Sequence, residues 1–575
     1  MLSTMQEVPL NISRILDYGA RAFGPTLIKT WESGEEFTST YRELAARAAA
    51  LAHALADELE IKPSHRVGTF MFNCTEHLET LFAVTCMGAV FNPLNKQLLN
   101  AQIAHIINLA EDQVIIADQR LAKQLGEVLS TGCPSVRAVI FIGRTNPQAA
   151  SRYIPSGITT FSYEALLDGR RSTYPWPLLP ENAAAALCYS TGTTGEPKGV
   201  VYSQRSLYLK AISLRTSDSL GISHGRTFLC CVPIYHTLSW CVPIAAVMSG
   251  APLVFPGADL TPRSLAELIE TTSPQAANGV PSIWIQVVMY YLAHPPNNIS
   301  LREIFSGGSP VPPALMDLWR NNFGIDLVQI WGMTETSGVT TVARPPTGLS
   351  PDAERSYRIT QGRFPAAVDY RVVNDGRVVN STERHDGEIQ VRGTWITGSY
   401  YHSSNEGSAV SDHPSDPSKA DNYAQQFTED GWLRTGDVGT VTADGFLILN
   451  DRARDVIRSG GEWIYSSLLE NEIMSAPEVV ECAVIGNHDR TWGERPLAIT
   501  KLVADVDATF ETADKLRDHL RETFPSWMLP EYWAFVENIA KTSVGKFDKI
   551  ELRATAARGD LDIIKLPGPG SSRVR

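Results

Sequence analysis

Hydrophobic and polar positions follow two alternating periods in the first part of the chain. Residues 41–60 (YRELAARAAALAHALADELE) carry apolar side chains at helical spacing, whereas residues 65–73 (HRVGTFMFN) form a short apolar run typical of a strand. The same alternation predicts a helix over 76–89, a strand over 112–119, a helix over 120–130 and a strand over 136–143. Repeated strand–helix units build largely parallel sheets that are covered by helices, so the pattern predicts an α/β fold.

The alternation resumes after residue 202. A helix capped by Ser203 is followed by a predicted strand over 227–236, a helix over 260–270, a strand over 301–308, a helix over 312–324 that ends at Gly324, and a strand over 325–336. Ligands of α/β folds bind in the loops at the ends of such strands. We therefore expect the functional residues in the segments after these strands.

From Gly387 onward the pattern changes to shorter strand-like pieces with Asp-Gly turns, which predicts a β-rich subdomain and then a small α+β unit. We expect a large N-terminal domain of layered α/β subdomains over residues 1–450, a hinge over 451–456 and a small mobile C-terminal domain over 457–560. The Ser/Asp-rich stretch 403–426 and the tail 561–575 are expected to be weakly ordered, because they contain few aliphatic residues.

Composition and charge exclude several classes of protein. The net charge of -13 and the lack of a basic run argue against nucleic-acid binding. The eight cysteines form no CxxC pair, which favours a reducing cytosol over a zinc site or a disulfide framework. The N-terminus has no signal-peptide pattern, and prolines interrupt the most apolar region, 228–257, so we expect a cytoplasmic protein without an integral membrane segment.

The stretch STGTTGEPKG, residues 190–199, is the first sign of chemistry. Its hydroxyls, glycines and Lys198 suit an anion, because small residues expose backbone N–H groups and the lysine adds a positive charge. It is not a Walker A loop, because Glu196 and Pro197 separate the last glycine of the loop from the lysine. Taken alone, a loop rich in glycine and threonine favours a flexible surface hairpin between two strands, so other segments must decide.

Those segments occur in order along the chain. Residues 189–201 (YSTGTTGEPKGVV) resemble the signature of the AMP-forming adenylate ligases, a superfamily that contains acyl-CoA synthetases, luciferases and peptide-synthetase adenylation domains. SGGSP (306–310), QIWGMTET (329–336), GWLRTGDVG (431–439), DRARDVIRSGGEWI (451–464) and KTSVGKFDK (541–549) resemble its further motifs. The resemblance covers nearly the whole chain and implies the adenylate-forming enzyme fold.

The resemblance implies a nucleotide site. Trp331 would lie against adenine, Asp437 would accept hydrogen bonds from the ribose hydroxyls, and Arg452 would contact ribose or phosphate. Thr191 and Glu335 would hold Mg²⁺, which prefers oxygen ligands. The complete set expected to bind ATP or AMP is Ser190, Thr191, Gly192, Thr193, Thr194, Lys198, Gly307, Gly308, Ser309, Gln329, Ile330, Trp331, Gly332, Met333, Thr334, Asp437, Arg452 and Lys546.

The acid and CoA sites are implied in the same way. His236 would lie beside the acyl carboxylate and Trp240 would gate a tunnel, although a core role for Trp240 is an equal alternative. Gly332, Val280, Ile283 and Trp284 would line the acyl pocket, although an aliphatic stripe at helical spacing is more often plain core. Ser459, Gly460, Gly461, Glu462 and Trp463 would line the CoA channel, and Arg454 would be the hinge.

The predicted activity is that of a fatty acyl-CoA synthetase for a medium- or long-chain acid. The acid would react with ATP to acyl-AMP and pyrophosphate, and CoA would then release AMP. Lys546, Thr191, Lys198, Glu335 and His236 would be the catalytic residues. The alternatives are an acyl-AMP ligase with a non-CoA acceptor, a CoA ligase for another carboxylic acid, and a nucleotide-binding scaffold that has lost catalysis. Similar long-chain synthetases dimerise, so a homodimer is expected.

Overall fold

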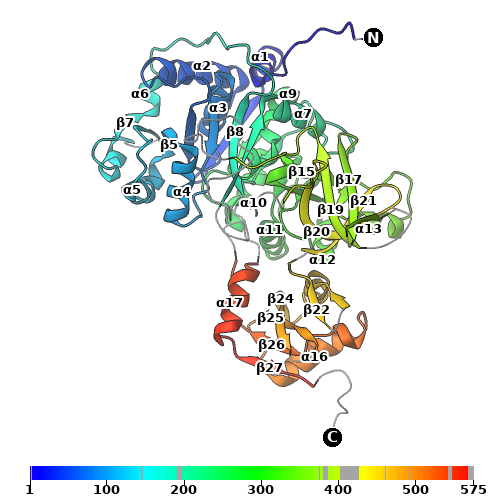
Figure 1. The fold of residues 1–575 in the computed structure, drawn as a ribbon. Helices are drawn as coiled ribbons and strands as arrows, with labels where there is room; N and C mark the ends of the chain where they lie inside the picture. The colour runs from blue at the N-terminus through cyan, green and yellow to red at the C-terminus, as the bar shows by residue number, and fades with distance from the viewer. Residues whose placement is uncertain are drawn as a thin grey trace.

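The computed structural model describes residues 1, 3–143, 147–190, 197–374, 376–379, 386–401, 426–452, 454–459, 462–489, 491–541 and 547–567. Residues 403–425 of the predicted weakly ordered stretch lie outside this part of the chain. Figure 1 shows a large unit, coloured blue to yellow, and below it a smaller unit of orange and red elements that the chain forms from residue 457 onward. The predicted α/β fold with a small C-terminal domain is confirmed.

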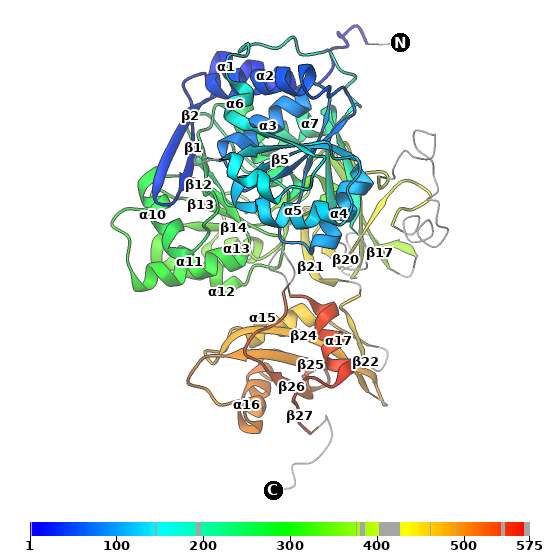
Figure 2. The same cartoon turned by 90° about the vertical axis from the view of Figure 1, so that its left-hand side faces the viewer.

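The first sheet is buried on both faces. Its strands are β3 (Arg66–Phe70), β4 (Val90–Pro93), β5 (Asp112–Asp118), β6 (Ala138–Ile142), β7 (Thr159–Ser162), β8 (Ala184–Ser190) and β9 (Lys198–Ser203). They lie in the order β7-β6-β5-β3-β4-β8-β9, with β8 and β9 as an antiparallel hairpin. Ala138 and Ile140 of β6 belong to the core of α2 (Tyr41–Asp57) and α3 (Thr75–Cys86). Val139 and Phe141 belong to the core on the opposite face, which α4 (Asn100–Ala110) and α5 (Ala122–Ser130) cover (Figure 2).

The second sheet shares a helical layer with the first. Its strands are β1 (Leu27–Glu32), β2 (Glu35–Thr40), β10 (Phe228–Cys230), β11 (Leu253–Phe255), β12 (Ala276–Gly279), β13 (Glu303–Ser306) and β14 (Asp326–Met333). One face packs in the same core as α2 and α3, together with α1 (Ile12–Ala22), α7 (Gln204–Leu214) and α9 (Val242–Ser249). The other face packs on α10 (Pro262–Thr272), α11 (Pro281–Ala293) and α12 (Pro313–Phe323).

An antiparallel β-rich subdomain continues from β14. It contains β15 (Gly338–Val342), β16 (Gly362–Arg363), β17 (Val368–Asn374), β18 (Arg377–Val379), β19 (Gly387–Gly393), β20 (Leu433–Val441), β21 (Phe446–Arg452) and the helix α13 (Pro351–Arg358). Because β14 pairs with the parallel β13 on one side and with the antiparallel β15 on the other, it joins the two kinds of sheet. The end of β14 therefore lies at a topological switch, where α/β proteins bind ligands.

The smaller unit has its own sheet. Its elements are β22 (Ile457–Ser459), β23 (Glu462–Ile464), α15 (Ser466–Ile473), β24 (Val479–Asp489), β25 (Gly493–Leu502), α16 (Phe510–Leu520), β26 (Tyr532–Phe535), α17 (Lys549–Arg558) and β27 (Ile563–Lys565). Residues 563–565 pair with β26, so the part of the predicted flexible tail that the structure describes contains a strand. No helix in the described part of the chain is long and apolar enough to cross a bilayer.

Capping residues in the sequence correctly predicted the ends of two helices. Ser203 caps α7 by accepting a hydrogen bond from the Ser206 amide, and Gly324 ends α12 with a φ of 66°. The strand predicted over 227–236 is shorter than expected, because β10 ends at Cys230. Pro233, which has no N–H for strand pairing, follows three residues later.

The packing of α5 generates a stability prediction. A Cβ added at Gly126 would lie 2.0 Å from the carbonyl oxygen of Tyr153, in the short 3-10 helix η2 (Pro147–Tyr153). We expect G126A to lower the free energy of unfolding by about 1–3 kcal/mol, because overpacking outweighs the better helix propensity of alanine. Thermal unfolding measures the change, and G398A is the control because a Cβ there has nothing within 4 Å. Equal unfolding midpoints for G126A and wild type would contradict this packing.

Candidate active site

Three residues from separate segments meet at the end of β14. The indole Nε1 of Trp331 donates a 2.7 Å hydrogen bond to Oδ2 of Asp437, and Nε of Arg452 lies 2.7 Å from Oδ1. Asp437 and Arg452 face each other across β20 and β21, and Asp437 is only 3% exposed. A buried carboxylate is costly unless both its oxygens have partners, and here both do. The structure thus brings together the residues predicted for adenine, ribose and phosphate.

The chain continues from this contact directly into the smaller unit. Arg454 Nε lies 3.9 Å from Oδ2 of Asp455, whose Oδ1 accepts a 2.6 Å hydrogen bond from Arg553 of α17. Burial lowers the pKa of Arg454, and the Asp455 carboxylate partly offsets this effect. The predicted hinge residue therefore lies between the buried Asp437 contact and the first ion pair to the smaller unit.

A second group of buried charges fixes the other side of the hinge. Oδ2 of Asp451 accepts hydrogen bonds of 2.6 Å from both the amide and the hydroxyl of Ser466. Lys549 donates to the same hydroxyl at 2.6 Å and lies 2.7 Å from Oε1 of Glu470. Burial raises the pKa of Asp451, while the nearby Lys549 ammonium lowers it. Lys549 is the last residue of the KTSVGKFDK motif, but no role was predicted for it from the sequence, and Glu470 lies outside the quoted motifs.

The buried Glu335 carboxylate is surrounded by polar side chains of the large unit. Its Oε1 accepts a 2.8 Å hydrogen bond from the hydroxyl of Tyr400, and Lys198 Nζ lies 5.0 Å from the centre of the Tyr400 ring. Burial lowers the pKa of Lys198, and the Glu335 carboxylate raises it in part. The neighbouring Thr334 carbonyl accepts a 2.7 Å hydrogen bond from the Tyr202 hydroxyl. Lys198, Thr334 and Glu335, predicted as phosphate and metal groups, therefore lie together, and Tyr202 and Tyr400 hold them.

Several of the residues predicted to lie near adenine hold the protein backbone in place. Gln329 accepts a 2.9 Å hydrogen bond from the Val311 amide and donates one of 2.9 Å to the Thr360 carbonyl. Ile330 is buried against Gly307, where a Cβ would lie 2.5 Å from Cδ1 of Ile330. Gly308 has a φ of 85°, and Ser309 and Met333 are half-buried. These residues set the course of the backbone around the end of β14.

Gly332 permits the closest backbone approach at the site. A Cβ there would lie 1.6 Å from the carbonyl oxygen of Gly338, at the point where the pairing of β14 and β15 shifts register. Only glycine fits such a contact. Gly338 in turn faces the acid side, because a Cβ on it would lie 3.3 Å from Cα of Trp240. The nucleotide side and the acid side therefore meet at these two glycines.

The segment after His236 has an unusual backbone. All five residues from Thr237 to Cys241 have positive φ values, between 42° and 60°, in a left-handed turn. Left-handed helical geometry costs roughly 1–2 kcal/mol per non-glycine residue. The turn buries Trp240 to 7% exposure and leaves His236 half-buried with its ring 4.7 Å from that of Tyr235. Such strain concentrates at functional sites, and the sequence carries no glycine that would have indicated it.

The remaining predicted acyl-pocket residues lie on α11 and just before it. Trp284 is fully buried and packs edge-on against Trp319 of α12, with the ring centroids 6.2 Å apart. Val280 and Ile283 are half-buried at the start of the same helix. The surroundings of Trp284 are those of a hydrophobic core.

One residue of the predicted CoA segment, Ser459, contacts a buried arginine. Nη1 of Arg495, which is 2% exposed, donates a 3.0 Å hydrogen bond to the Ser459 hydroxyl, while its Nε lies 2.7 Å from Oε1 of Glu531. Glu462 and Trp463 are exposed on the adjacent β23. Arg495 thus anchors the strand that carries Ser459, a contact that the sequence did not indicate.

Glu335 is the carboxylate that could bind a divalent cation beside Lys198. Within the described part of the chain, no group of three or more histidine, cysteine, aspartate or glutamate residues could hold a metal ion. Glu335 alone beside Lys198 suits Mg²⁺, which uses one or two carboxylates and completes its shell with water and substrate phosphates. The predicted residues Thr191, Gly192, Thr193, Thr194, Gly460, Gly461 and Lys546 lie outside the described residues. Ser190, at the end of β8, donates a 3.4 Å hydrogen bond to the Lys198 carbonyl.

Comparisons with known proteins agree with this arrangement. The AMP-binding enzyme family matches residues 21–401, and the AMP-binding enzyme C-terminal domain matches residues 468–546. A medium-chain-fatty-acid–CoA ligase from Ectopseudomonas oleovorans is 34% identical over 558 residues, which cover 96% of this chain and 97% of the relative. A 3-methylmercaptopropionyl-CoA ligase from Ruegeria lacuscaerulensis is 33% identical over 558 residues, which cover 96% and 98%.

A solved structure has the same fold. The anthranilate CoA ligase in complex with anthranoyl-AMP superimposes with a TM-score of 0.82 at 22% identity, covering 97% of this chain and all of the ligase chain. The family matches and the two relatives show that the chain belongs to the AMP-binding enzyme family and is an AMP-forming acyl-CoA synthetase, an acid–thiol ligase.

Proposed function

We propose that this acyl-CoA synthetase activates a medium- or long-chain fatty acid through an acyl-adenylate formed with Mg·ATP. The observation that carries the proposal is the convergence of Trp331, Asp437 and Arg452 beside the Lys198–Glu335 group. An indole face, a carboxylate with two acceptor oxygens and cations suit adenine, a ribose diol and phosphates, respectively. The relatives act on different acids, as their names state, so the acid is the least determined part of the proposal.

In the first half-reaction the acid carboxylate attacks the α-phosphate and pyrophosphate leaves. This step needs neutralised negative charge more than proton transfer. Lys198 is the described cation beside Glu335, and Thr334 is held next to both by Tyr202. When bound to Glu335, Mg²⁺ would supply further charge neutralisation on the triphosphate. We assign the contact with the carboxylate and the α-phosphate to Lys546, from its place in the KTSVGKFDK signature.

In the second half-reaction the CoA thiolate attacks the acyl carbonyl and AMP leaves. We place the pantetheine of CoA along Ser459, Glu462 and Trp463. Arg495 holds this segment in place through its hydrogen bond to the Ser459 hydroxyl. The two halves use one site in turn, so the smaller unit must reorient about Arg454 between them. The Asp455–Arg553 and Lys549–Glu470 ion pairs lie beside the hinge about which the smaller unit would rotate.

The proposed activity is tested by its products. We expect mass spectrometry to detect acyl-CoA and AMP when the pure protein is incubated with Mg·ATP, CoA and acids from acetate to oleate. A chain-length optimum among medium or long chains would support the proposed acid. Acyl-AMP that accumulates equally with and without CoA would contradict the CoA step and favour a ligase with another acceptor. Nucleotide binding without pyrophosphate release would indicate a protein that has lost catalysis.

The hydrogen bond from Tyr400 to Glu335 generates a second prediction. We expect Y400F to lower kcat/KM for Mg·ATP about tenfold to 150-fold, because a hydrogen bond to a charged group contributes roughly 1.5–3 kcal/mol. Acid-dependent exchange between pyrophosphate and ATP measures this half-reaction. Y401F is the matched control, because Tyr401 pairs with Gly199 through its backbone. Equal losses in Y400F and Y401F would show that the Glu335 contact is not the cause.

A further inference from the structure

Three consecutive residues at the start of α15 join the smaller unit to the large one. The hydroxyl of the half-buried Tyr465 donates a 2.5 Å hydrogen bond to Oδ2 of Asp386, in the segment just before β19. The next two residues, Ser466 and Ser467, donate to the end of β21, to the Asp451 carboxylate and to the preceding carbonyl oxygen. Figure 2 shows α15 at the edge of the smaller unit that faces β21. The proposed mechanism gives Tyr465 and Asp386 no role.

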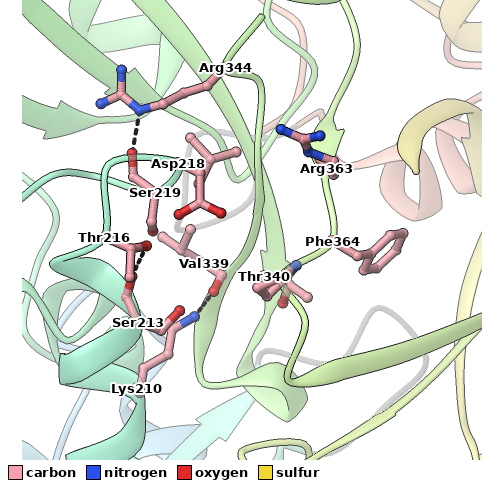
Figure 3. A pocket seen from close by; sticks show the side chains of 12 residues that line it. Lys210, Ser213, Thr216, Asp218, Ser219, Val339, Thr340, Arg344, Arg363 and Phe364 are labelled. Carbon is pink, nitrogen blue, oxygen red and sulfur yellow. Dashed lines mark hydrogen bonds between the residues drawn. The ribbon is translucent and has the colours of Figure 1, made fainter. Parts of the chain in front are cut away.

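A buried polar contact within one unit provides a comparison. Lys210 of α7 donates a hydrogen bond to the carbonyl oxygen of Val339 on β15, as Figure 3 shows, and its Nζ lies 5.0 Å from the centre of the Trp395 ring. All three residues belong to the large unit, so this contact is the same in every orientation of the smaller unit. The bond between Tyr465 and Asp386 differs, because its two partners lie in different units.

Asp386 is fixed to the large unit at some distance from the hinge. Its carbonyl oxygen accepts a 2.8 Å hydrogen bond from Asn374 at the end of β17. The next residue, Gly387, begins β19, and β20 separates β19 from β21. Neighbouring strands lie about 4.8 Å apart, so Asp386 lies roughly 10 Å from the strand that leads to the hinge at Arg454.

The contact therefore belongs to one orientation of the smaller unit. A rotation about the hinge displaces the Tyr465 hydroxyl relative to the Asp386 carboxylate, and a hydrogen bond is lost once its two heavy atoms are about 3.6 Å apart. An interaction that is made in only one of two conformations shifts the equilibrium toward that conformation.

The orientation in this structure fits the first half-reaction. Lys549, the last residue of the KTSVGKFDK signature, donates a 2.6 Å hydrogen bond to the Ser466 hydroxyl, so this end of the signature lies beside the contact between the units. Glu462 and Trp463 of the predicted CoA segment are instead exposed. We assigned Lys546 of the signature to the adenylate step and the exposed segment to CoA.

We propose that Tyr465 is a positioning residue whose hydrogen bond to Asp386 holds the smaller unit in the orientation for adenylation, and that this bond opens before CoA reacts. The inference rests on the proposed function, because it concerns the order of its two half-reactions. The bond stabilises one orientation only, so it sets the ratio of the two half-reaction rates. A contribution of Tyr465 to the stability of the fold alone is the alternative that the test must separate.

The test measures the two half-reactions separately in the full-length enzyme. Acid-dependent exchange between pyrophosphate and ATP measures adenylation with the acid that the product screen identifies. Formation of the thioester from the supplied adenylate of that acid and CoA, without ATP, measures the second step. We expect the ratio of the first rate to the second to fall about tenfold in Y465F, because a hydrogen bond to a carboxylate contributes at least roughly that factor.

Matched variants assign the change to the contact between the units. Y532F is the control, because the Tyr532 hydroxyl donates a 3.3 Å hydrogen bond to Asp489 within the smaller unit, and its ratio should equal that of wild type. D386A removes the acceptor and should lower the ratio by the same factor as Y465F. The double variant Y465F/D386A should lower it no further than either single variant, because the two changes remove one interaction.

An unchanged ratio in Y465F overturns the proposal, whether or not both rates fall, because a loss of fold stability lowers both half-reactions alike. A ratio that rises also overturns it, since the contact would then belong to the orientation for CoA. If wild type forms no thioester from a supplied adenylate, the proposed function itself fails and the inference falls with it. That result is distinct from an unchanged ratio.

Discussion

The buried carboxylate of Asp437 is the interaction on which the rest of the site depends. Its two oxygens are used by Trp331 from β14 and Arg452 from β21, so one charge joins the switch strand of the large sheet to the last strand before the hinge. Removing Arg452 would leave the buried carboxylate without its counter-charge, at a cost of several kcal/mol. Because Arg452 is followed within three residues by the Asp455–Arg553 ion pair, the nucleotide contact and the joint between the two units form one continuous structure.

Close backbone contact, rather than side-chain chemistry, connects the nucleotide side to the acid side. Gly332 and Gly338 approach so closely that no Cβ fits at Gly332, and Gly338 packs on the left-handed turn from Thr237 to Cys241. This turn stores strain that the surrounding core must offset. On the next residue of β15 the same strand binds Lys210, so a shift of β15 would affect the nucleotide, the acid and the buried lysine together.

Much of this arrangement could be predicted from the sequence. Strand–helix periodicity predicted the layered α/β fold, and the motifs around Trp331, Asp437 and Arg452 predicted residues that the structure places in contact. Motif spacing could not predict Tyr400, Lys210 or Arg495, because each acts through a tertiary contact with a residue more than 30 positions away. The left-handed turn was equally hidden, since its residues are ones that normally avoid positive φ. Apolar spacing also could not separate a pocket wall from core, as the packing of Trp284 against Trp319 illustrates.

The most direct measurement of the role of the Asp437 contact is calorimetric titration with AMP. W331F removes the indole N–H that binds Asp437 and keeps an aromatic face, while W432F makes the same change at the half-buried Trp432, just before β20. We predict that W331F binds AMP about tenfold more weakly than wild type, because a buried hydrogen bond to a carboxylate contributes roughly 1.5 kcal/mol or more. W432F should bind as wild type does. Unchanged AMP affinity in a folded W331F protein would contradict the central place given to this contact.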